Sequence, residues 1–255
     1  MTALLEARGI EKDFRGIRAL TAVDIAVGEG ERVGLIGPNG AGKTTLFNCI
    51  SGVLKPNDGV VLFGGNDIGS LAVNRRALLG IGRTFQRLEL FNDSTVREHL
   101  LIAERVRLGT GSLWKDLIGL GRPTNDEIRV CDDMLEMLGL LEIRNEPIEA
   151  LSLGQGRLVE VGRALMTRPR MLLLDEPSSG LDRAETAALA RTLREVQEQQ
   201  RFAILLVEHD VELVADFTER CYVLDFGEVV ASGPTAGVLA DPIVRRAYLG
   251  DMDLT

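Results

Sequence analysis

The feature that most constrains this chain is a short glycine-rich stretch between an apolar run and a helical run. Residues 37–44 read GPNGAGKT, which matches the pattern G-x-x-x-x-G-K-[ST], and residues 33–36 before them read VGLI. Glycines let the backbone wrap an anion with its N–H groups pointing inward, and the N-terminus of the following helix adds a positive partial charge. The stretch therefore predicts a phosphate-binding loop between a buried strand and a helix.

This loop predicts a site for a nucleoside triphosphate. Lys43 is expected to reach the β- and γ-phosphates, and the Thr44 hydroxyl is expected to bind Mg²⁺. The alternative is a glycine turn that happens to precede Lys-Thr, but the strand–loop–helix context favours the phosphate site. The residues expected to hold the nucleotide here are Gly37, Pro38, Asn39, Gly40, Ala41, Gly42, Lys43, Thr44 and Thr45.

A second motif, MLLLDEP at residues 171–177, is an apolar strand that ends in two acids. Open α/β sheets bind ligands at the carboxyl ends of their strands, so Asp175 is expected to bind Mg²⁺ there, directly or through water. Glu176 is then expected near the γ-phosphate, where it can polarise an attacking water. The alternative is a polar helix start after a buried strand. The phosphate loop elsewhere in the chain favours the metal site.

Composition limits the remaining classes. The chain has 255 residues, of which 45% are hydrophobic and 26% charged, as expected for one large α/β domain. A formal net charge of −9 argues against a nucleic-acid partner. Three scattered cysteines without a CxxC pair favour a reducing compartment. The sequence has neither a signal peptide pattern nor an apolar run of about 18 residues, which predicts a chain that is soluble by itself.

The hydrophobic pattern predicts a layered α/β core with a helical insert. Between about 95 and 151 there is almost no strand signal; Thr95 and Glu98 resemble a capping box, and 127–138 is amphipathic. Residues 220–255 favour two short strands and then short helices. Elsewhere, short apolar strands alternate with helices. The expected strands are 20–27, 32–36, 171–174 and 203–207, and the expected helices are 44–54, 183–199 and 210–217.

Further motifs, in this order along the chain, resemble those of the ATP-binding cassette (ABC) ATPases. RTFQ at 83–86 is similar to their Q-loop, and LSLGQ at 151–155 is similar to their LSGGQ signature. SSGLD at 178–182 resembles their D-loop, and EHD at 208–210 resembles the segment of their switch histidine. Phe14 stands where the family places an aromatic residue that stacks on adenine. The resemblance covers essentially the whole chain.

The resemblance implies an α/β, P-loop NTPase (RecA-like) core with a small antiparallel β portion, in one ABC ATPase domain over 1–255. Residues 1–86 and 156–255 would form the catalytic core, and 87–155 the helical subdomain with the signature motif. ATP and Mg²⁺ would be the cofactors, and the chain would hydrolyse ATP.

The resemblance also implies residue roles. Gln86 would bind Mg²⁺ together with Thr44 and Asp175, and His209 would contact the γ-phosphate beside the catalytic Glu176. Two ATPase chains would pair head to tail, so the signature residues of one chain would complete the site of the other. These residues acting in trans are Ser152, Gly154 and Gln155.

Each of these residues also has a structural interpretation. Phe14 could belong to the core at a strand edge, Gln86 could be an ordinary loop residue, and His209 could be structural. Ser152 could be a helix N-cap. The signature also departs from the family pattern: Leu153 replaces its first glycine and Gly156 follows Gln155. Gly162 is expected to interrupt the next helix, at a cost of about 1 kcal/mol relative to alanine.

The long segment between Gln86 and Ser152 resembles the larger of the two ATPase subunits of branched-chain amino-acid importers. Two more stretches resemble the ATPases of these importers. One is RTFQ with Leu90-Phe91 and Thr95-Val96 after it, and the other is DPIVRRAYLG at 241–250. The resemblance implies an ATPase that powers uptake of branched-chain amino acids. Transmembrane permease subunits, a second ATPase subunit in a homo- or heterodimer, and indirectly a solute-binding protein would be its partners. Its place would be cytoplasmic, peripheral on the inner face of the cell membrane.

The face around 83–92 is expected to receive a short permease helix, because Phe85, Leu88, Leu90 and Phe91 supply more apolar surface than a short loop needs. These side chains could instead fill the seam between core and insert. Three other functions stay open: a related importer for amides, urea or other amino acids, a soluble ABC ATPase of DNA maintenance or translation, and a non-catalytic nucleotide-binding regulator. The negative net charge and the single phosphate loop argue against a soluble ABC ATPase of DNA maintenance or translation. The presence of Glu176 and His209 argues against a non-catalytic regulator.

Overall fold

The computed structural model describes residues 3–84, 94–108, 123–242 and 244–245. The chain folds as two compact units. The α/β unit comprises Met1–Arg83, Arg170–Pro177 and Arg201–Thr255, and the helical unit comprises Thr84–Pro169 and Ser178–Gln200. Within these described stretches, no helix has the length and apolar character needed to cross a bilayer.

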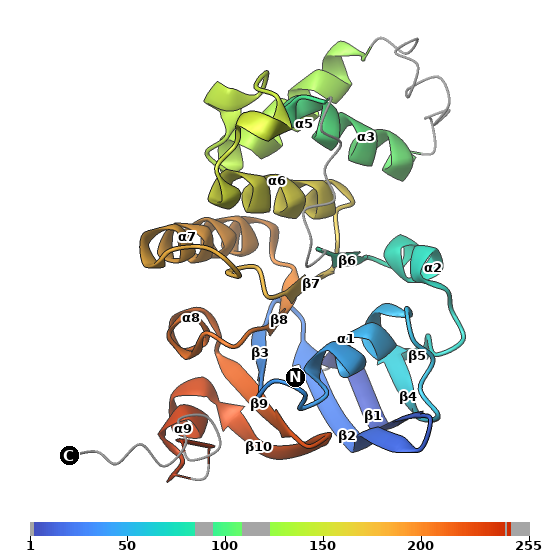
Figure 1. The fold of residues 1–255 in the computed structure, drawn as a ribbon. Helices are drawn as coiled ribbons and strands as arrows, with labels where there is room; N and C mark the ends of the chain where they lie inside the picture. Colours follow the sequence, from blue (N-terminus) through green and yellow to red (C-terminus); the bar gives the residue numbers. More distant parts are fainter. Residues whose placement is uncertain (1–2, 85–93, 109–122, 243, 246–255) are drawn as a thin grey trace, which may run out of the picture. The chain divides into compact units, whose positions relative to one another are not determined.

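A six-stranded sheet forms one layer of the α/β unit (Figure 1). Its order is β10-β9-β3-β8-β7-β6, and all neighbours are parallel except β10, which is antiparallel to β9. Every residue of β7 and β8 is buried, which explains their unbroken apolar sequences. The strands are β3 (Arg32–Ile36), β6 (Ile81–Arg83), β7 (Met171–Asp175), β8 (Ala203–Val207), β9 (Arg220–Asp225) and β10 (Glu228–Pro234).

A four-stranded antiparallel sheet, in the order β2-β1-β4-β5, forms the second layer. The sequence pattern predicted only part of β2, and the small antiparallel portion itself came from the family resemblance. Long β1 is partly exposed along its length, so its hydrophobic signal is weak. The strands are β1 (Ala3–Phe14), β2 (Ile17–Gly28), β4 (Asp58–Phe63) and β5 (Asn66–Asp67).

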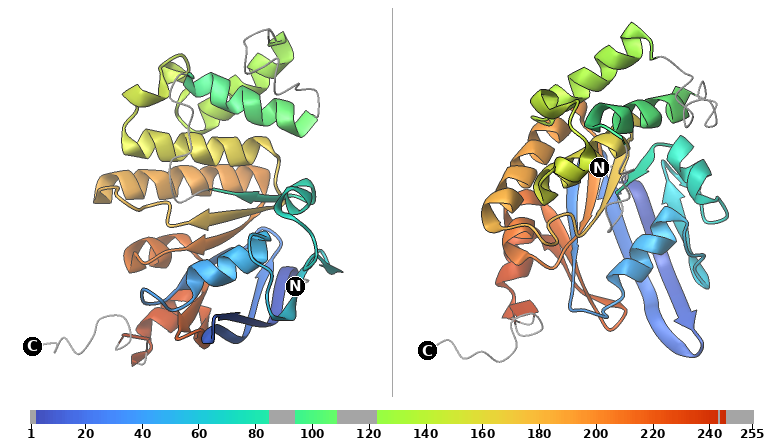
Figure 2. Two further views of the ribbon diagram at one scale, coloured as in Figure 1. Left: turned by 45° about the vertical axis from the view of Figure 1, so that its right-hand side comes forward. Right: turned by 45° about the horizontal axis from the view of Figure 1, so that its top comes forward.

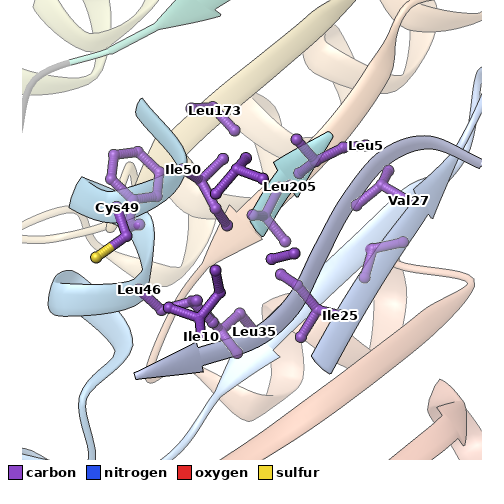
Figure 3. Close-up of a cluster of buried hydrophobic side chains, with 14 of the residues drawn as sticks. Leu5, Ile10, Ile25, Val27, Leu35, Leu46, Cys49, Ile50, Leu173 and Leu205 are labelled. Atoms are coloured by element: carbon purple, nitrogen blue, oxygen red, sulfur yellow. The ribbon is translucent and has the colours of Figure 1, made fainter. Parts of the chain in front are cut away.

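Helix α1 (Lys43–Ser51) packs against both sheets, through β1 and β2 on one side and β7 and β8 on the other. Figure 3 shows the resulting core, where side chains from both sheets and from α1 point toward one another. The labelled examples are Leu5, Ile25, Leu35, Leu46, Ile50 and Leu205. This packing holds the loop before α1 at the carboxyl end of β3. Helices α2 (Val73–Leu78), α8 (Val211–Phe217) and α9 (Thr235–Ala240) complete the unit.

The helical unit is built on α6, which packs against α3, α5 and α7. Both views of Figure 2 show α6 and α7 side by side. The predicted capping box is present at the start of α3: the Thr95 amide donates to Glu98 Oε2 at 2.7 Å, and the Glu98 amide donates to Thr95 Oγ1 at 3.3 Å. The helices are α3 (Val96–Leu108), α5 (Asn125–Met137), α6 (Leu153–Met166) and α7 (Arg183–Gln200), with 3₁₀ turns at Leu141–Ile143 and Ile148–Ala150.

The expected interruption at Gly162 is wrong, because α6 continues through it. A Cβ atom at Gly162 would lie 2.7 Å from Leu138 Cδ1, so the missing side chain lets α6 lie close to the end of α5. The compact helical unit includes α6 and α7, because α6 packs with α3 and α5 on one hand and with α7 on the other. The functional division into a catalytic core and a helical subdomain stays a prediction.

Candidate nucleotide-binding site

The loop between β3 and α1 depends on its glycines. Gly40 and Gly42 have φ angles of 83° and 104°, which side chains disfavour. A Cβ atom at Gly42 would lie 2.7 Å from the Ala19 carbonyl oxygen, and one at Gly37 would collide with the Leu224 carbonyl oxygen. Gly42 is also the N-cap of α1 and supplies no side-chain cap. The loop therefore leaves the first-turn amides of α1 to be satisfied from outside the helix.

Lys43 lies inside this loop. Its side chain is 5% exposed, and its Nζ donates to the carbonyl oxygens of Gly37 at 2.5 Å and Pro38 at 3.0 Å. Burial lowers the pKa of Lys43, while the carboxylates of Glu176 and Asp175 nearby raise it. The ammonium is therefore held by carbonyl oxygens of the loop, where it can contact a phosphate bound by the loop amides.

Asp175 and Glu176 follow each other at the carboxyl end of β7. Burial raises the pKa of Asp175, the charges of Glu176 and Glu208 act in the same direction, and Arg83 and Lys43 oppose it. Glu176 has a φ of 48°, unusual for a residue other than glycine, and its amide donates to the Val207 carbonyl oxygen at 2.9 Å. Strain of this kind costs about 1–3 kcal/mol and gathers at functional sites.

The residues at this edge fit a magnesium ion. Asp175 is 3% exposed, and its Oδ1 is buried without a hydrogen-bond partner among the described residues. A buried carboxylate oxygen without a partner is costly unless something binds it. Thr44 offers a hydroxyl on the first turn of α1. Carboxylate and hydroxyl oxygens are the hard ligands that Mg²⁺ prefers.

His209 follows the end of β8, next to the carboxylate of Glu208, which has no predicted role among the sequence motifs. Glu208 is fully buried, and its Oε2 accepts from the His209 amide at 3.1 Å and lies 3.7 Å from His209 Nδ1. Its charge acts on both Lys43 and Asp175. Its position directly after an apolar strand, like that of Glu176, was the available sequence signal.

Phe14 is the last residue of β1 and is 42% exposed, so it is not a core side chain. Lys12 Nζ lies 5.4 Å from its ring centroid. Gln86, Phe85, Leu88, Leu90 and Phe91 lie outside the described residues.

The signature segment forms the N-terminus of α6 in the helical unit. Ser152 is the N-cap: its Oγ accepts from the Gln155 amide at 3.2 Å, and Gln155 Oε1 accepts from the Ser152 amide at 2.9 Å. A Cβ atom at Gly154 would be in ordinary contact with Glu185 Oε1 at 3.5 Å. A Cβ atom at Gly180 would lie 2.9 Å from Leu153 Cδ2, so Leu153 lies against the 178–182 segment.

The structure therefore brings Lys43, Asp175, Glu176 and His209 to one edge of the parallel sheet, with Thr44 on the adjoining helix turn. These groups can hold a nucleoside triphosphate, a hard cation and a water molecule. The arrangement defines a P-loop nucleotide site.

A family model described as "ABC transporter" matches residues 20–179. The chain belongs to this family, and it is accordingly a nucleotide-binding ATPase subunit of the ABC transporter class. The resemblance stated from the sequence motifs is confirmed.

Curated relatives match along nearly the whole chain. The high-affinity branched-chain amino acid transport ATP-binding protein LivG of Escherichia coli (strain K12) is 38% identical over 97% of this chain and 98% of its own length. BraF of Pseudomonas aeruginosa, with the same description, is 36% identical over the same shares. The lipopolysaccharide export system ATP-binding protein LptB of Haemophilus influenzae is 32% identical over 98% of both chains.

Solved structures give the same family. The ADP conformation of MJ1267, an ATP-binding cassette of an ABC transporter, has a TM-score of 0.87 and 32% identity, over 98% of this chain and 100% of that one. The expected ABC ATPase fold is confirmed.

Proposed function

We propose that this chain hydrolyses ATP with Mg²⁺ at the site formed by the loop 37–45 and the carboxyl ends of β7 and β8. The observation that carries the proposal is the gathering of Lys43, Asp175, Glu176 and His209 at one sheet edge. Lys43 and the loop amides bind the phosphates, and Phe14 stacks on the base. Thr44, Asp175 and Gln86 hold Mg²⁺, which when bound neutralises charge on the phosphates.

Glu176 acts on water in this proposal. Its carboxylate orients and polarises a water molecule toward the γ-phosphate, and His209 contacts the γ-phosphate from the adjacent strand end. The rate gain comes from positioning and electrostatic stabilisation. The strained backbone at Glu176 supports this role, because strain is retained where it fixes a functional side chain.

The working ATPase is a head-to-tail pair in which Ser152, Gly154 and Gln155 of one chain complete the site of the other. The α6 N-terminus supports this role, because first-turn amides and the helix dipole favour an anion.

The cargo that the comparisons support best is branched-chain amino acids. LivG and BraF carry this function in their names and match this chain over almost their full length. The chain then acts with permease subunits at the inner face of the cell membrane, and indirectly with a solute-binding protein. LptB, an export subunit, is less similar at 32% identity, so export is the second candidate.

Substitution of Glu176 tests the chemistry. Glu176→Gln should retain ATP binding, because the phosphate contacts remain, while hydrolysis falls about 100- to 10,000-fold. The control is Glu198→Gln, an exposed carboxylate at the end of α7, which should hydrolyse ATP as the wild type does. Wild-type turnover in Glu176→Gln would contradict the assignment.

Uptake tests the cargo. Cells that lack this chain should lose uptake of labelled leucine, isoleucine and valine, and the Glu176→Gln chain should not restore it. Normal branched-chain uptake with a defect for an amide or urea would point to a related importer. An intact uptake profile with an envelope export defect would favour the second candidate.

The segment 83–92 with Thr95 is the proposed docking face for a permease helix. Changing Leu90 and Phe91 to serine should leave nucleotide binding intact while permease association and transport fail. Loss of folding or of ATP binding in this double variant would make these residues part of the core.

A further inference from the structure

Arg76 on α2 is buried more completely than its charge would suggest. Its exposed fraction is 1%, and it is among the largest fully buried side chains of the described residues. Its neighbour Arg75 is exposed. Burial lowers the pKa of Arg76. Removing a guanidinium from water is costly, so its contacts must compensate.

The contacts of Arg76 are all with carbonyl oxygens. Nη1 donates to Cys49 at 2.8 Å and to Ile50 at 2.6 Å, both in the last turn of α1. Nε donates to Leu71 at 3.0 Å, and Nη2 donates to Gly69 at 3.2 Å. A cation at the C-terminus of a helix satisfies its last carbonyls and opposes the negative end of its dipole. Arg76 thus caps the helix whose opposite end carries the phosphate loop.

The surroundings are shaped around this guanidinium. Gly52, the C-cap of α1, has a φ of 85°, and a Cβ atom there would lie 2.7 Å from Arg76 Nε. Glycine at this position therefore leaves room for the Arg76 side chain as well as for the backbone conformation.

A second arginine reaches the same helix from β6. Arg83 Nη1 donates to Ser51 Oγ at 3.0 Å, and its guanidinium lies 4.8 Å from the ring centroid of Phe47. β6 pairs in parallel with β7, with Arg83 opposite Leu173 and thus two positions before Asp175. Arg83 therefore joins α1 to the strand pair that ends at the predicted metal-binding carboxylate.

We propose that Arg76 and Arg83 are positioning residues that fix the phosphate-loop helix against the strand pair β6–β7. The two side chains hold four of the last five residues of α1 from the segment 73–83, which is also where the chain leaves the α/β unit toward Gln86. They set the distance between a phosphate bound at Lys43 and a cation bound at Asp175. The inference rests on the proposed roles of Lys43 and Asp175.

The test is a double-mutant cycle on the full chain, with ATP hydrolysis, ATP binding and melting temperature measured for each variant. Arg76→Met removes the hydrogen bonds while retaining most of the apolar volume. The kcat of this variant should fall about 10- to 100-fold because the reacting groups are misplaced. The KM and the dissociation constant for ATP should stay within about threefold of wild type, because the loop amides and Lys43 remain.

Two further variants separate positioning from stability. Arg76→Lys can donate to Cys49 and Ile50 but lacks the planar fork, so it should recover part of the lost kcat. Arg75→Met, on the exposed side of the same helix, should match wild type in every measurement. A lowered melting temperature in Arg76→Met with wild-type kcat for the folded protein would overturn the proposal, since it would leave a purely structural role.

The cycle itself tests the connection. If both arginines act by fixing α1 against the strand pair β6–β7, Arg76→Met in the Arg83→Met background should change kcat by less than about twofold. If the losses of kcat in the two single variants multiply in the double variant, the arginines act independently and this shared role is overturned. A wild-type chain that neither binds nor hydrolyses ATP would instead overturn the proposed function, so the two failures are distinguishable.

Discussion

Two helix N-termini in this chain can each face an anion, and they are built differently. The N-cap of helix α1 is Gly42, a residue without a side chain, in a left-handed conformation and next to the buried Lys43. The N-cap of helix α6 is Ser152, with a complete capping box in which Ser152 and Gln155 satisfy each other. The first belongs to the α/β unit and the second to the helical unit.

The difference indicates different tasks. An N-terminus without a side-chain cap leaves its amides for a ligand, and a buried ammonium beside it supplies charge. A helix N-terminus with a capping box has some of its amides satisfied by its own side chains. Only the remaining first-turn amides are available to a ligand. We therefore expect α1 to dominate nucleotide affinity, and α6 to act on turnover through a second chain.

The largest expected effect is at the α1 end. Lys43→Met should weaken ATP binding by about 100-fold or more, because it removes a charge-assisted contact to phosphate. Calorimetry on the full chain measures this, with the exposed Lys55→Met as control. Unchanged affinity in Lys43→Met would place the phosphates elsewhere.

A matched glycine pair compares the two ends directly. Gly42→Ala puts a side chain at a φ of 104° and against the Ala19 carbonyl oxygen, so it should cost more than about 2 kcal/mol of stability and abolish ATP binding. Gly154→Ala meets only ordinary contacts near Glu185 and should fold and bind ATP as wild type does. Equal loss of ATP binding in both variants would contradict the proposed difference between the N-termini of α1 and α6.

A smaller effect is expected from the cap of α6. Ser152→Ala removes the acceptor for the Gln155 amide and should cost about 1 kcal/mol of stability. ATP affinity of the isolated chain should not change, since this terminus completes the site of another chain. Thermal unfolding and calorimetry measure the two effects, and a clear affinity loss would argue that the signature acts within its own chain.

The smallest expected effect concerns acid and the helical unit. His99 is 1% exposed, and burial lowers its pKa. The charges of Arg163 and Glu98 near it act in opposite directions, while its Nδ1 lies 3.1 Å from the Thr95 carbonyl oxygen. The pKa of His99 in the folded state is below its unfolded value of about 6.5. The contribution of neutral, buried His99 to folding stability is therefore fully present above about pH 6.5 and decreases as the pH falls below that value. Wild type should lose more melting temperature than His99→Gln between about pH 7.5 and about pH 5.5.

Local motifs made much of the site predictable from the sequence. The loop 37–44 and the DEP segment carry their chemistry in consecutive residues, and the strand beside each is apolar because it is buried on both faces. The start of α3 was predictable for the same reason, since Thr95 and Glu98 lie one helical turn apart.

The remaining features depend on contacts between distant segments. Arg76 reads as an ordinary basic residue beside Arg75, and only the fold shows that it reaches the end of α1. The position of Glu208 directly after an apolar strand is a weak signal, and the fold strengthens it because the charge of Glu208 acts on both Lys43 and Asp175. The expectation for Gly162 was wrong because a glycine is needed there for the close approach of Leu138, at the end of α5, and the sequence of α6 alone does not show this contact.

The head-to-tail pairing of the α1 and α6 N-termini is tested most directly by mixing two inactive chains. One carries Lys43→Met and retains its α6 terminus, and the other carries Ser152→Arg and retains its phosphate loop. If the two termini meet across a pair of chains, half of the pairs in an equal mixture contain one intact site. ATP hydrolysis should then return to about a quarter of the wild-type rate, while each chain alone stays inactive. No recovery in a mixture that demonstrably forms mixed pairs would contradict a site shared between the two chains.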